Sequence, residues 1–158
     1  MKIALPIIFV LLFAACATTK SVSGEKAGMT DGWYVHLDTA KTQANTSRKP
    51  ILVLFTGSDW CAPCMQLERE VLSKKAFQDY AKKNLVLVKM DFPRRSPEPS
   101  IEMQVHRDTV ATKYLGERQS VPTVFLLNDD GSIIAKTTFR AGGAEAYVRH
   151  LEHLLSGR

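Results

Sequence analysis

The chain has 158 residues, of which 45% are hydrophobic, enough for one globular domain plus a short additional segment. Its formal net charge of +5 is spread along the sequence without a dominant basic block, and aromatic residues do not alternate with Lys and Arg. We therefore expect a solvated cationic surface, and the composition argues against a nucleic-acid-binding protein.

The N-terminal residues have the composition of an export signal. Met1 and Lys2 give a short positive start, and Ile3 to Phe13 is an apolar run broken only by Pro6. The run is too short to cross a bilayer, for which about 20 residues are needed, but it matches the hydrophobic region of a secretory signal.

Cys16 follows this run directly after two small residues. The segment resembles the bacterial lipoprotein signal, in which the cysteine is lipidated and becomes the mature N-terminus, although Phe13 stands where an aliphatic residue is usual. Two other outcomes stay open: cleavage by ordinary signal peptidase at the small residues around Ala15 to Ala17, which would remove Cys16, or an uncleaved anchor. All three outcomes export the domain.

We therefore divide the chain into a lipoprotein-type signal peptide at residues 1–16, a flexible tether at 17–30 and a folded domain at 31–158. The tether is rich in Thr, Ser, Lys and Gly and has little apolar content. These segments predict a protein of the cell envelope or periplasm that is anchored to a membrane through a lipid on Cys16. Ala17 stands in place of the Asp that commonly signals inner-membrane retention, which favours the outer membrane if the cell has two membranes.

The folded part alternates between strand-like and helix-like patterns. A continuous apolar run, Ile51 to Phe55, has the composition of a strand buried on both faces of a parallel sheet. Asp38 is expected to cap the first helix, and Asp130-Gly131 suits a hairpin turn between the last two strands. The expected strands cover 32–36, 51–55, 84–91, 123–127 and 132–139, and the expected helices cover 38–47, 65–72, 75–83, 100–115 and 144–155. With the adjoining helices 65–72 and 75–83 counted as one unit, the order is β-α-β-α-β-α-β-β-α. It predicts an α/β fold with a mixed central sheet flanked by helices on both faces.

The most informative motif is the pair Cys61 and Cys64, which lies between the apolar run and a helix-like segment. Two cysteines separated by two residues at the first turn of a helix can close a small disulfide ring. Cys61 sits where unpaired backbone N–H groups and the positive end of the helix dipole favour a thiolate, which can lower its pKa from about 8.5 to about 3.5–7.5. We expect Cys61 to be the more exposed sulfur and the attacking nucleophile, and Cys64 to resolve the mixed disulfide. The motif indicates redox chemistry.

Two motifs carry a resemblance to the thioredoxin superfamily. Trp60-Cys61-Ala62-Pro63-Cys64 follows a buried strand, and Val121-Pro122-Thr123 precedes the hairpin. Together with the order of elements, the resemblance covers residues 33–155 and implies a thioredoxin fold. Segments 55–61 and 85–93 are similar, more narrowly, to a group of exported bacterial thioredoxin-like proteins and to the periplasmic thioredoxin-like domain of the transmembrane thiol:disulfide interchange protein.

The resemblance also implies roles for residues around the two cysteines. In this family the proline that matches Pro122 is cis, and its loop lies against the disulfide. The backbone of Val121 is then left free to pair with an extended substrate chain; a strand-initiating proline is the alternative interpretation of Pro122. We expect Trp60 to cover one side of the active site, with core packing as its alternative role.

The group that accepts a proton from Cys64 stays open. Many thioredoxins carry a buried carboxylate in the strand before the motif, but Ile51 to Phe55 contains no acid. Asp59 and Glu68 are the acids to consider, and each can also be interpreted as an ordinary capping or surface residue. Water can serve instead.

The other polar side chains considered are expected to be solvated. His150 and His153 are three apart on a helix, a spacing that can bind metal, but they flank its apolar face instead of joining the cysteines. Arg94-Arg95 lies in a proline-rich loop, and we assign no role to His36 or His106. The sequence predicts no metal site and no cofactor.

We therefore expect an exported, lipid-anchored thiol:disulfide oxidoreductase that exchanges a Cys61–Cys64 disulfide with cysteines of envelope proteins. Pro63 resembles reducing thioredoxins more than strongly oxidising relatives, which favours reduction. A reductase outside the cytoplasm needs a membrane electron donor. We expect a monomer that contacts the membrane through its N-terminal lipid and binds no nucleic acid.

Two other functions stay open. Cys61 and Cys64 could be thiolate ligands in a metal-handling protein, although no His or Met of suitable spacing lies nearby. They could also form a static disulfide in a non-catalytic binding module, although strained and exposed disulfides are the labile kind.

Overall fold

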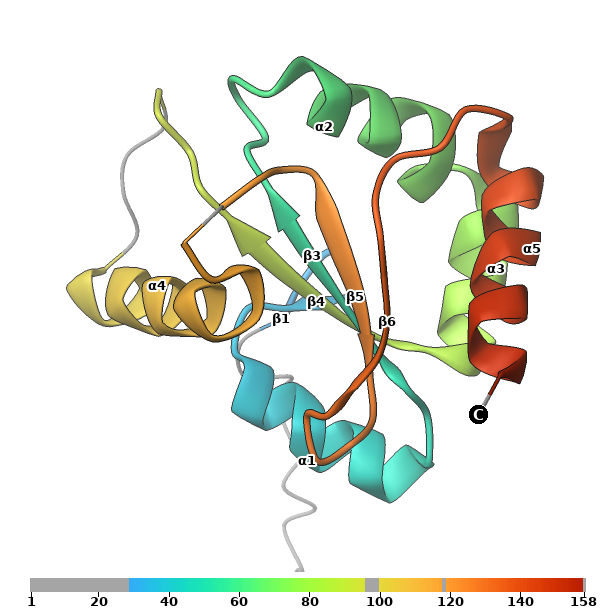
Figure 1. Ribbon diagram of the computed structural model, residues 1–158, viewed down its shortest axis with the longest axis horizontal. Coiled ribbons are helices and arrows are strands. Elements are labelled where there is room, and N and C mark those ends of the chain that lie inside the picture. Colours follow the sequence, from blue (N-terminus) through green and yellow to red (C-terminus); the bar gives the residue numbers. More distant parts are fainter. Residues whose placement is uncertain (1–28, 96–99, 118, 158) are drawn as a thin grey trace, which may run out of the picture.

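The structure is a computed structural model that describes residues 29–95, 100–117 and 119–157 (Figure 1). These residues form one mixed sheet of six strands in the order β1-β2-β4-β3-β5-β6. The strands are β1 (Met29–Thr30), β2 (Trp33–Tyr34), β3 (Ile51–Thr56), β4 (Val86–Asp91), β5 (Thr123–Leu127) and β6 (Ile133–Thr137). β2, β4 and β3 run parallel, whereas β1, β5 and β6 are antiparallel to their neighbours. The predicted α/β class and mixed sheet are confirmed.

Helices cover both faces of this sheet (Figure 1). One layer consists of α1 (Leu37–Ser47) and α4 (Ile101–Leu115); the other consists of α2 (Ala62–Leu67), the π-helical turn η1 (Glu68–Leu72), α3 (Lys75–Asn84) and α5 (Gly143–Ser156). In the part of the chain that the structure describes, no helix is both long enough and apolar enough to cross a bilayer.

The central strand β3 is buried at all six positions. Alternate side chains from Ile51 to Phe55 belong to the core formed with α1 and α4, and the side chains between them belong to the core formed with α2, α3 and α5. A strand that lies between two helical layers has no solvated face. This explains why its sequence is continuously apolar rather than alternating.

The pairing of β3 with β4 determines where the functional loops lie. The two strands are parallel and in register from Ile51↔Val86 to Thr56↔Asp91, so they end at the same edge of the sheet. The β3–α2 loop (residues 57–61) and the post-β4 segment (residues 92–95) therefore leave the sheet side by side.

The N-terminal strand differs from the prediction. A strand is predicted over 32–36, but β2 contains only Trp33 and Tyr34 and pairs with an additional strand, β1. Asp31 (φ 50°) and Gly32 (φ 85°) make the turn between them, and an Asp-Gly pair tolerates these positive φ values. Met29–Thr30, at the end of the expected tether, therefore belongs to the sheet. Residues 1–28, including Cys16, lie outside the described residues.

Helix α1 begins one residue earlier than predicted, and Asp38 is not its cap. The N-cap residue is His36, whose side chain makes no capping hydrogen bond, and Asp38 lies within the first turn. The N–H of Leu37 instead donates to Nε2 of His106 on α4, 3.1 Å away. The rings of His36 and His106 have centroids 4.8 Å apart. Two histidines to which the sequence assigns no role thus join α1 to α4.

The remaining boundaries agree with the prediction to within a few residues. The helix predicted over 65–72 begins at Ala62 and continues as η1. The last predicted strand, 132–139, is shorter and ends at Thr137. Oγ1 of Thr137 lies 2.9 Å from Nε2 of His150, so this half-buried histidine joins β6 to α5, while His153 is exposed as predicted.

His106 links the stability of the fold to pH, because its Nε2 must be unprotonated to accept the Leu37 N–H. Burial lowers the pKa of His106 from 6.5, and the nearby His36 lowers it further, against the opposing effect of Asp38. The unfolded chain then takes up protons at a higher pH than the folded protein, so the free energy of unfolding falls as the pH drops below about 6.5. We expect His106→Gln to lose part of this dependence, measured as urea midpoints at about pH 7.5 and about pH 5.

His150 provides a second arm of the same experiment. Burial and then the charge of Arg140 lower its pKa, so the double variant His106→Gln/His150→Gln should lose more of the pH dependence than either single variant. The exposed His153 also lowers the pKa of His150, after burial and Arg140, so His153→Gln should have the smallest effect of the three single variants. A pH dependence that is unchanged in His106→Gln would contradict a stabilising role for the His106 bond.

Candidate active site

The disulfide closes at the junction of β3 and α2. Cys61 is the N-cap residue of α2 and has extended backbone angles (φ −89°, ψ 102°), and Cys64 lies in the first turn. Their Cα atoms are 5.2 Å apart and their sulfurs are bonded. The Cys64 N–H donates to Sγ of Cys61 at 3.3 Å, so a backbone donor of the helix N-terminus faces this sulfur. Pro63 occupies the same turn, where its missing N–H removes no helical hydrogen bond.

Both cysteines are nearly inaccessible in the disulfide form. Cys61 is 5% exposed and Cys64 is 3% exposed, so in the disulfide form residue exposure does not distinguish the two cysteines. The sulfurs differ more in their surroundings, because Cys61 faces the N-terminus of α2 and Cys64 lies inside its first turn. Ala62, Pro63 and Met65 are exposed and form an apolar surface beside the disulfide.

The loop before β5 lies against the disulfide, as the family resemblance implies. The peptide bond between Val121 and Pro122 is cis, and the carbonyl oxygen of Val121 lies 3.7 Å from Sγ of Cys61. Oγ1 of Thr138 donates to the Pro122 carbonyl at 2.6 Å, and Oγ1 of Thr123 donates to a backbone carbonyl of the same loop at 2.8 Å. Two threonine hydroxyls therefore hold the loop in place beside the cysteines.

The β3–α2 loop is tied by hydrogen bonds to the end of β4 and to the post-β4 segment. The N–H and Oγ of Ser58 donate to the two carboxylate oxygens of Asp91, at 2.9 Å and 2.5 Å. Nε1 of Trp60 donates to the carbonyl of Phe92 at 2.7 Å. Gly57 leaves room for the indole, since a Cβ at this position would overlap the ring of Trp60. These contacts fix the position of Trp60 directly before Cys61.

Asp59 joins the same two segments. Its carboxylate accepts the N–H of Arg94, at 2.9 Å and 3.1 Å to its two oxygens, and the N–H of Arg95 at 2.6 Å. The guanidinium carbon of Arg94 lies 3.8 Å from the ring centroid of Trp60. Asp59 therefore has a structural role in positioning the post-β4 segment. Arg94 is not merely a solvated loop residue, because it covers part of Trp60.

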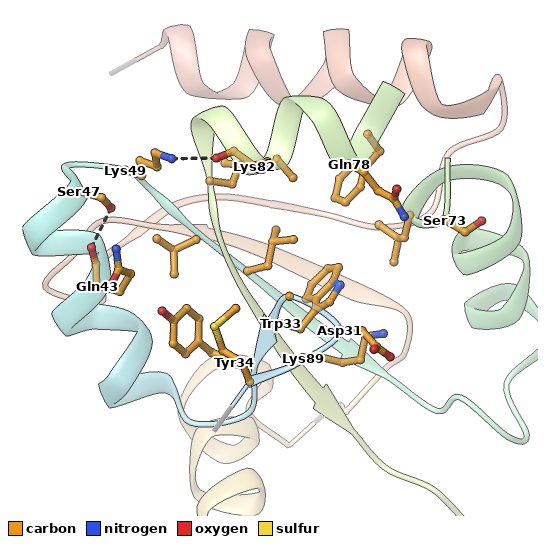
Figure 2. Close-up of a pocket in the computed structure, with 18 of the residues that line it drawn as sticks. Asp31, Trp33, Tyr34, Gln43, Ser47, Lys49, Ser73, Gln78, Lys82 and Lys89 are labelled. Carbon is orange, nitrogen blue, oxygen red and sulfur yellow. Dashed lines mark hydrogen bonds between the residues drawn. The ribbon is translucent and has the colours of Figure 1, made fainter. Parts of the chain in front are cut away.

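Glu68, the other acid considered as a partner of Cys64, lies in a surface ion pair. Its Oε2 is 3.4 Å from Nζ of Lys89, which in turn lies over the ring of Trp33, 5.0 Å from the centroid. These residues line a cavity of about 780 Å³ beside β2 and α3 (Figure 2). No residue of the β3–α2 loop or of α2 lines it, so the cavity lies apart from the disulfide.

Within the described ranges, no group of three or more His, Cys, Asp or Glu side chains is placed to hold a metal ion. The chemistry that the arrangement can perform with its own groups is thiol–disulfide exchange. This reaction needs one accessible thiolate, a second cysteine within bonding distance and no bound group.

Sequence reasoning missed Asp91 and Arg107, which hold the β3–α2 loop and the post-β4 segment in place. Asp91 lies in a segment that carries the family resemblance, but no role is inferred for it from the sequence. Arg107 on α4 is 6% exposed, donates from Nη1 to the Asp91 carbonyl at 2.6 Å, and lies 4.9 Å from the ring centroid of Phe92. No local pattern marks Arg107, because its partners belong to another element.

Comparison with known proteins gives consistent results. A family model described as thioredoxin-like matches residues 32–129. The disulfide bond reductase DsbH of Chlamydia pneumoniae is 28% identical over 156 residues, which cover 94% of this chain and 91% of that protein.

Solved structures also resemble the chain. A DsbH oxidoreductase matches with a TM-score of 0.73 and 28% identity, covering 80% of this chain and 85% of the other. A thioredoxin from Thermus thermophilus matches with a TM-score of 0.55 and 18% identity, covering 80% of this chain and 88% of the other. The arrangement of strands and helices is therefore the thioredoxin fold, as predicted.

The close approach of Gly57 to Trp60 gives a testable prediction. Gly57→Ala places a methyl group against the indole, which must then move away from the Phe92 carbonyl. We expect the free energy of unfolding to fall by about 1–3 kcal/mol, the usual cost of overpacking, together with a change in tryptophan fluorescence of the folded protein. Urea denaturation measures both quantities.

The control is Gly157→Ala, because a Cβ at Gly157 meets no atom within 4 Å. Its free energy of unfolding should change by less than about 0.5 kcal/mol. Equal stabilities of Gly57→Ala and wild type would show that the indole is not confined as described.

Proposed function

Because the chain belongs to the thioredoxin-like family, we propose that it is an exported thiol:disulfide oxidoreductase in which Cys61 and Cys64 cycle between a disulfide and two thiols. The observation that carries this proposal is the position of Cys61. Its sulfur lies at the N-terminus of α2, accepts an N–H bond at 3.3 Å and lies 3.7 Å from the carbonyl of Val121. Helix N–H groups stabilise a thiolate at this position, and the thiolate is the nucleophile in disulfide exchange.

In the reducing direction the Cys61 thiolate attacks one sulfur of a substrate disulfide. That S–S bond breaks, the other substrate sulfur leaves as a thiolate, and a mixed disulfide forms with Cys61. Cys64 then loses its proton and attacks the Cys61 sulfur, which releases the second substrate thiolate and restores the Cys61–Cys64 bond. Two electrons pass from the protein to the substrate, and the substrate thiolates take up protons from water.

The proton of Cys64 is proposed to leave to water. Asp59 accepts backbone N–H groups of the post-β4 segment, and Glu68 is paired with Lys89. The strand before the motif consists of apolar residues apart from Thr56. Both acids considered as proton acceptors thus bind other groups, which supports water as the acceptor.

We propose reduction as the physiological direction. The DsbH relative carries the name disulfide bond reductase. The position of Pro63 also resembles reducing thioredoxins more than strongly oxidising relatives. A membrane dithiol donor would return two electrons to Cys61–Cys64 after each turnover, and cysteine-containing envelope proteins would be the substrates. The cis Val121–Pro122 loop would pair with the substrate backbone, in the manner of an added strand.

The proposed location is the cell envelope, with residues 1–16 as the signal, Cys16 as the lipid anchor and a monomeric domain beyond the tether. Incorporation of labelled fatty acid into the wild type, and its loss in Cys16→Ser, would test the anchor. Incorporation into neither protein would exclude lipidation.

The two cysteines of the motif should be indispensable in an insulin-reduction assay with dithiothreitol as electron donor. We expect Cys61→Ser to abolish the acceleration over dithiothreitol alone, because it removes the nucleophile. Cys64→Ser should reduce it by at least about 10²-fold, because the mixed disulfide is no longer resolved. Cys16→Ser is the matched cysteine control and should retain the wild-type rate.

Equal rates in all four proteins would contradict the enzymatic proposal. A reduction potential of the Cys61–Cys64 disulfide below about −300 mV would indicate a static disulfide instead.

Alkylation kinetics test the assignment of the nucleophile. In reduced Cys64→Ser, the rate of Cys61 alkylation by iodoacetamide should rise with a midpoint below about pH 8.5, because the N-terminus of α2 stabilises the thiolate. In reduced Cys61→Ser, Cys64 should react more slowly at every pH. A Cys61 that reacts like free cysteine would contradict this assignment.

A further inference from the structure

We propose that Arg94 determines substrate preference, by binding a carboxylate that lies close to the reacting cysteine of the substrate. This inference rests on the proposed function and adds a substrate class to it: polypeptide disulfides flanked by Asp or Glu. It starts from the contact between Arg94 and Trp60, the residue directly before the nucleophile.

Arg94 is held against Trp60, the residue directly before Cys61, although it lies 34 positions further along the chain. Its guanidinium carbon is 3.8 Å from the ring centroid of Trp60, and the Trp60 indole is itself bonded to the Phe92 carbonyl. The backbone N–H of Arg94 is bonded to Asp59. The side chain of Arg94 therefore stacks on a fixed ring, and its backbone is also fixed. Such a side chain loses less conformational entropy when it binds a ligand than an unrestrained surface arginine does.

The guanidinium of Arg94 is exposed on the surface. The hydrogen bonds described for this carboxylate run to the N–H groups of Arg94 and Arg95, which are main-chain groups. The ion pairs among the described residues join Arg69 to Glu70, Lys75 to Asp79 and Lys89 to Glu68. Arg94 takes part in none of these three pairs, and its side chain is exposed.

The surface around the disulfide supports the same preference. The residues at the start of α2 are apolar and exposed, Ala62, Pro63 and Met65, and carry no charge. Arg140 is a second exposed cation, two residues beyond Thr138, whose hydroxyl holds the Pro122 carbonyl. An extended chain reacting at Cys61 would therefore meet an apolar surface and cationic groups.

The geometry limits where the substrate carboxylate can lie. Arg94 stacks on the neighbour of Cys61, and an extended chain advances about 3.3 Å per residue, so the acid should lie roughly one to three positions from the substrate cysteine, the adjacent position included. A planar guanidinium binds a carboxylate through two parallel N–H bonds, which a lysine cannot reproduce. Because Arg94 is exposed, the selectivity should be modest and should weaken with salt.

The test uses three peptide disulfides that differ only in the residue next to the cysteine, which is Glu, Gln or Lys. The full-length protein reduces each peptide with dithiothreitol as donor, and kcat/KM is measured at low salt and at about 0.5 M NaCl. We expect the wild type to prefer the Glu peptide over the Lys peptide by about five- to tenfold, with the Gln peptide between them and the preference reduced at high salt. Each turnover oxidises the Cys61–Cys64 dithiol and reduces one peptide disulfide.

Substitutions at Arg94 assign the preference. Arg94→Gln should bring the Glu/Lys ratio close to one, Arg94→Glu should invert it, and Arg94→Lys should retain only part of it because the bidentate contact is lost. Lys83→Gln is the charge-matched control, since the exposed Lys83 lies near the C-terminus of α3, which leads to the opposite end of β4 from the disulfide. This control should keep the wild-type ratio.

The outcomes separate the two proposals. A wild type that reduces all three peptides equally well overturns the role of Arg94 and leaves the reductase intact. A preference for the Glu peptide that survives in Arg94→Glu also overturns the role of Arg94. So does a Glu/Lys ratio that changes in Lys83→Gln as much as in Arg94→Gln. A wild type that reduces none of the peptides contradicts the proposed function, and the substrate preference with it.

Discussion

The parallel pairing of β3 with β4 is the constraint on which the rest of the site depends. Both strands end at the pair Thr56↔Asp91, so two chain segments distant in sequence leave the sheet at one edge. Ser58 then binds the Asp91 carboxylate, and Trp60 binds the Phe92 carbonyl. Hydrogen bonds of this kind contribute about 1 kcal/mol each, and somewhat more where one partner is charged. Together they fix the direction in which α2 begins, and with it the position of its first residue.

At that position two opposing effects act on the sulfur of Cys61. Burial in apolar surroundings raises the pKa of a thiol, whereas N–H groups at a helix N-terminus lower it. Cys61 is only 5% exposed, but the Cys64 N–H lies 3.3 Å from its sulfur and faces the place where negative charge develops. A local donor acts at short range and needs no rearrangement when a thiolate forms, which is how the proposed reaction can use a sulfur that is largely buried. In the proposed reaction, the exposed apolar start of α2 is where a substrate sulfur would approach.

Much of the fold could be predicted from the sequence because the signals were local. The run from Ile51 to Phe55 predicted a central strand, the position of Cys61 and Cys64 predicted the start of α2, and Val121-Pro122 carried the resemblance that implied a cis bond. The Asp31-Gly32 turn was also a local signal, and attention to it would have predicted β1.

The interactions that sequence reasoning missed connect residues from separate elements. His106 accepts the Leu37 N–H from 69 positions away, Asp59 binds the post-β4 segment, and Arg107 holds the end of β4 from α4. The hydrophobic periodicity of a segment does not reveal such pairs, because it depends only on the helix or loop to which each residue belongs.

Two kinds of position can be distinguished around Cys61. Residues such as Gly57 and Asp59 are constrained by contacts on several sides, whereas Arg94 combines a fixed backbone with an exposed charge. Substrate preference can therefore change at Arg94 while the ties that position the disulfide stay intact.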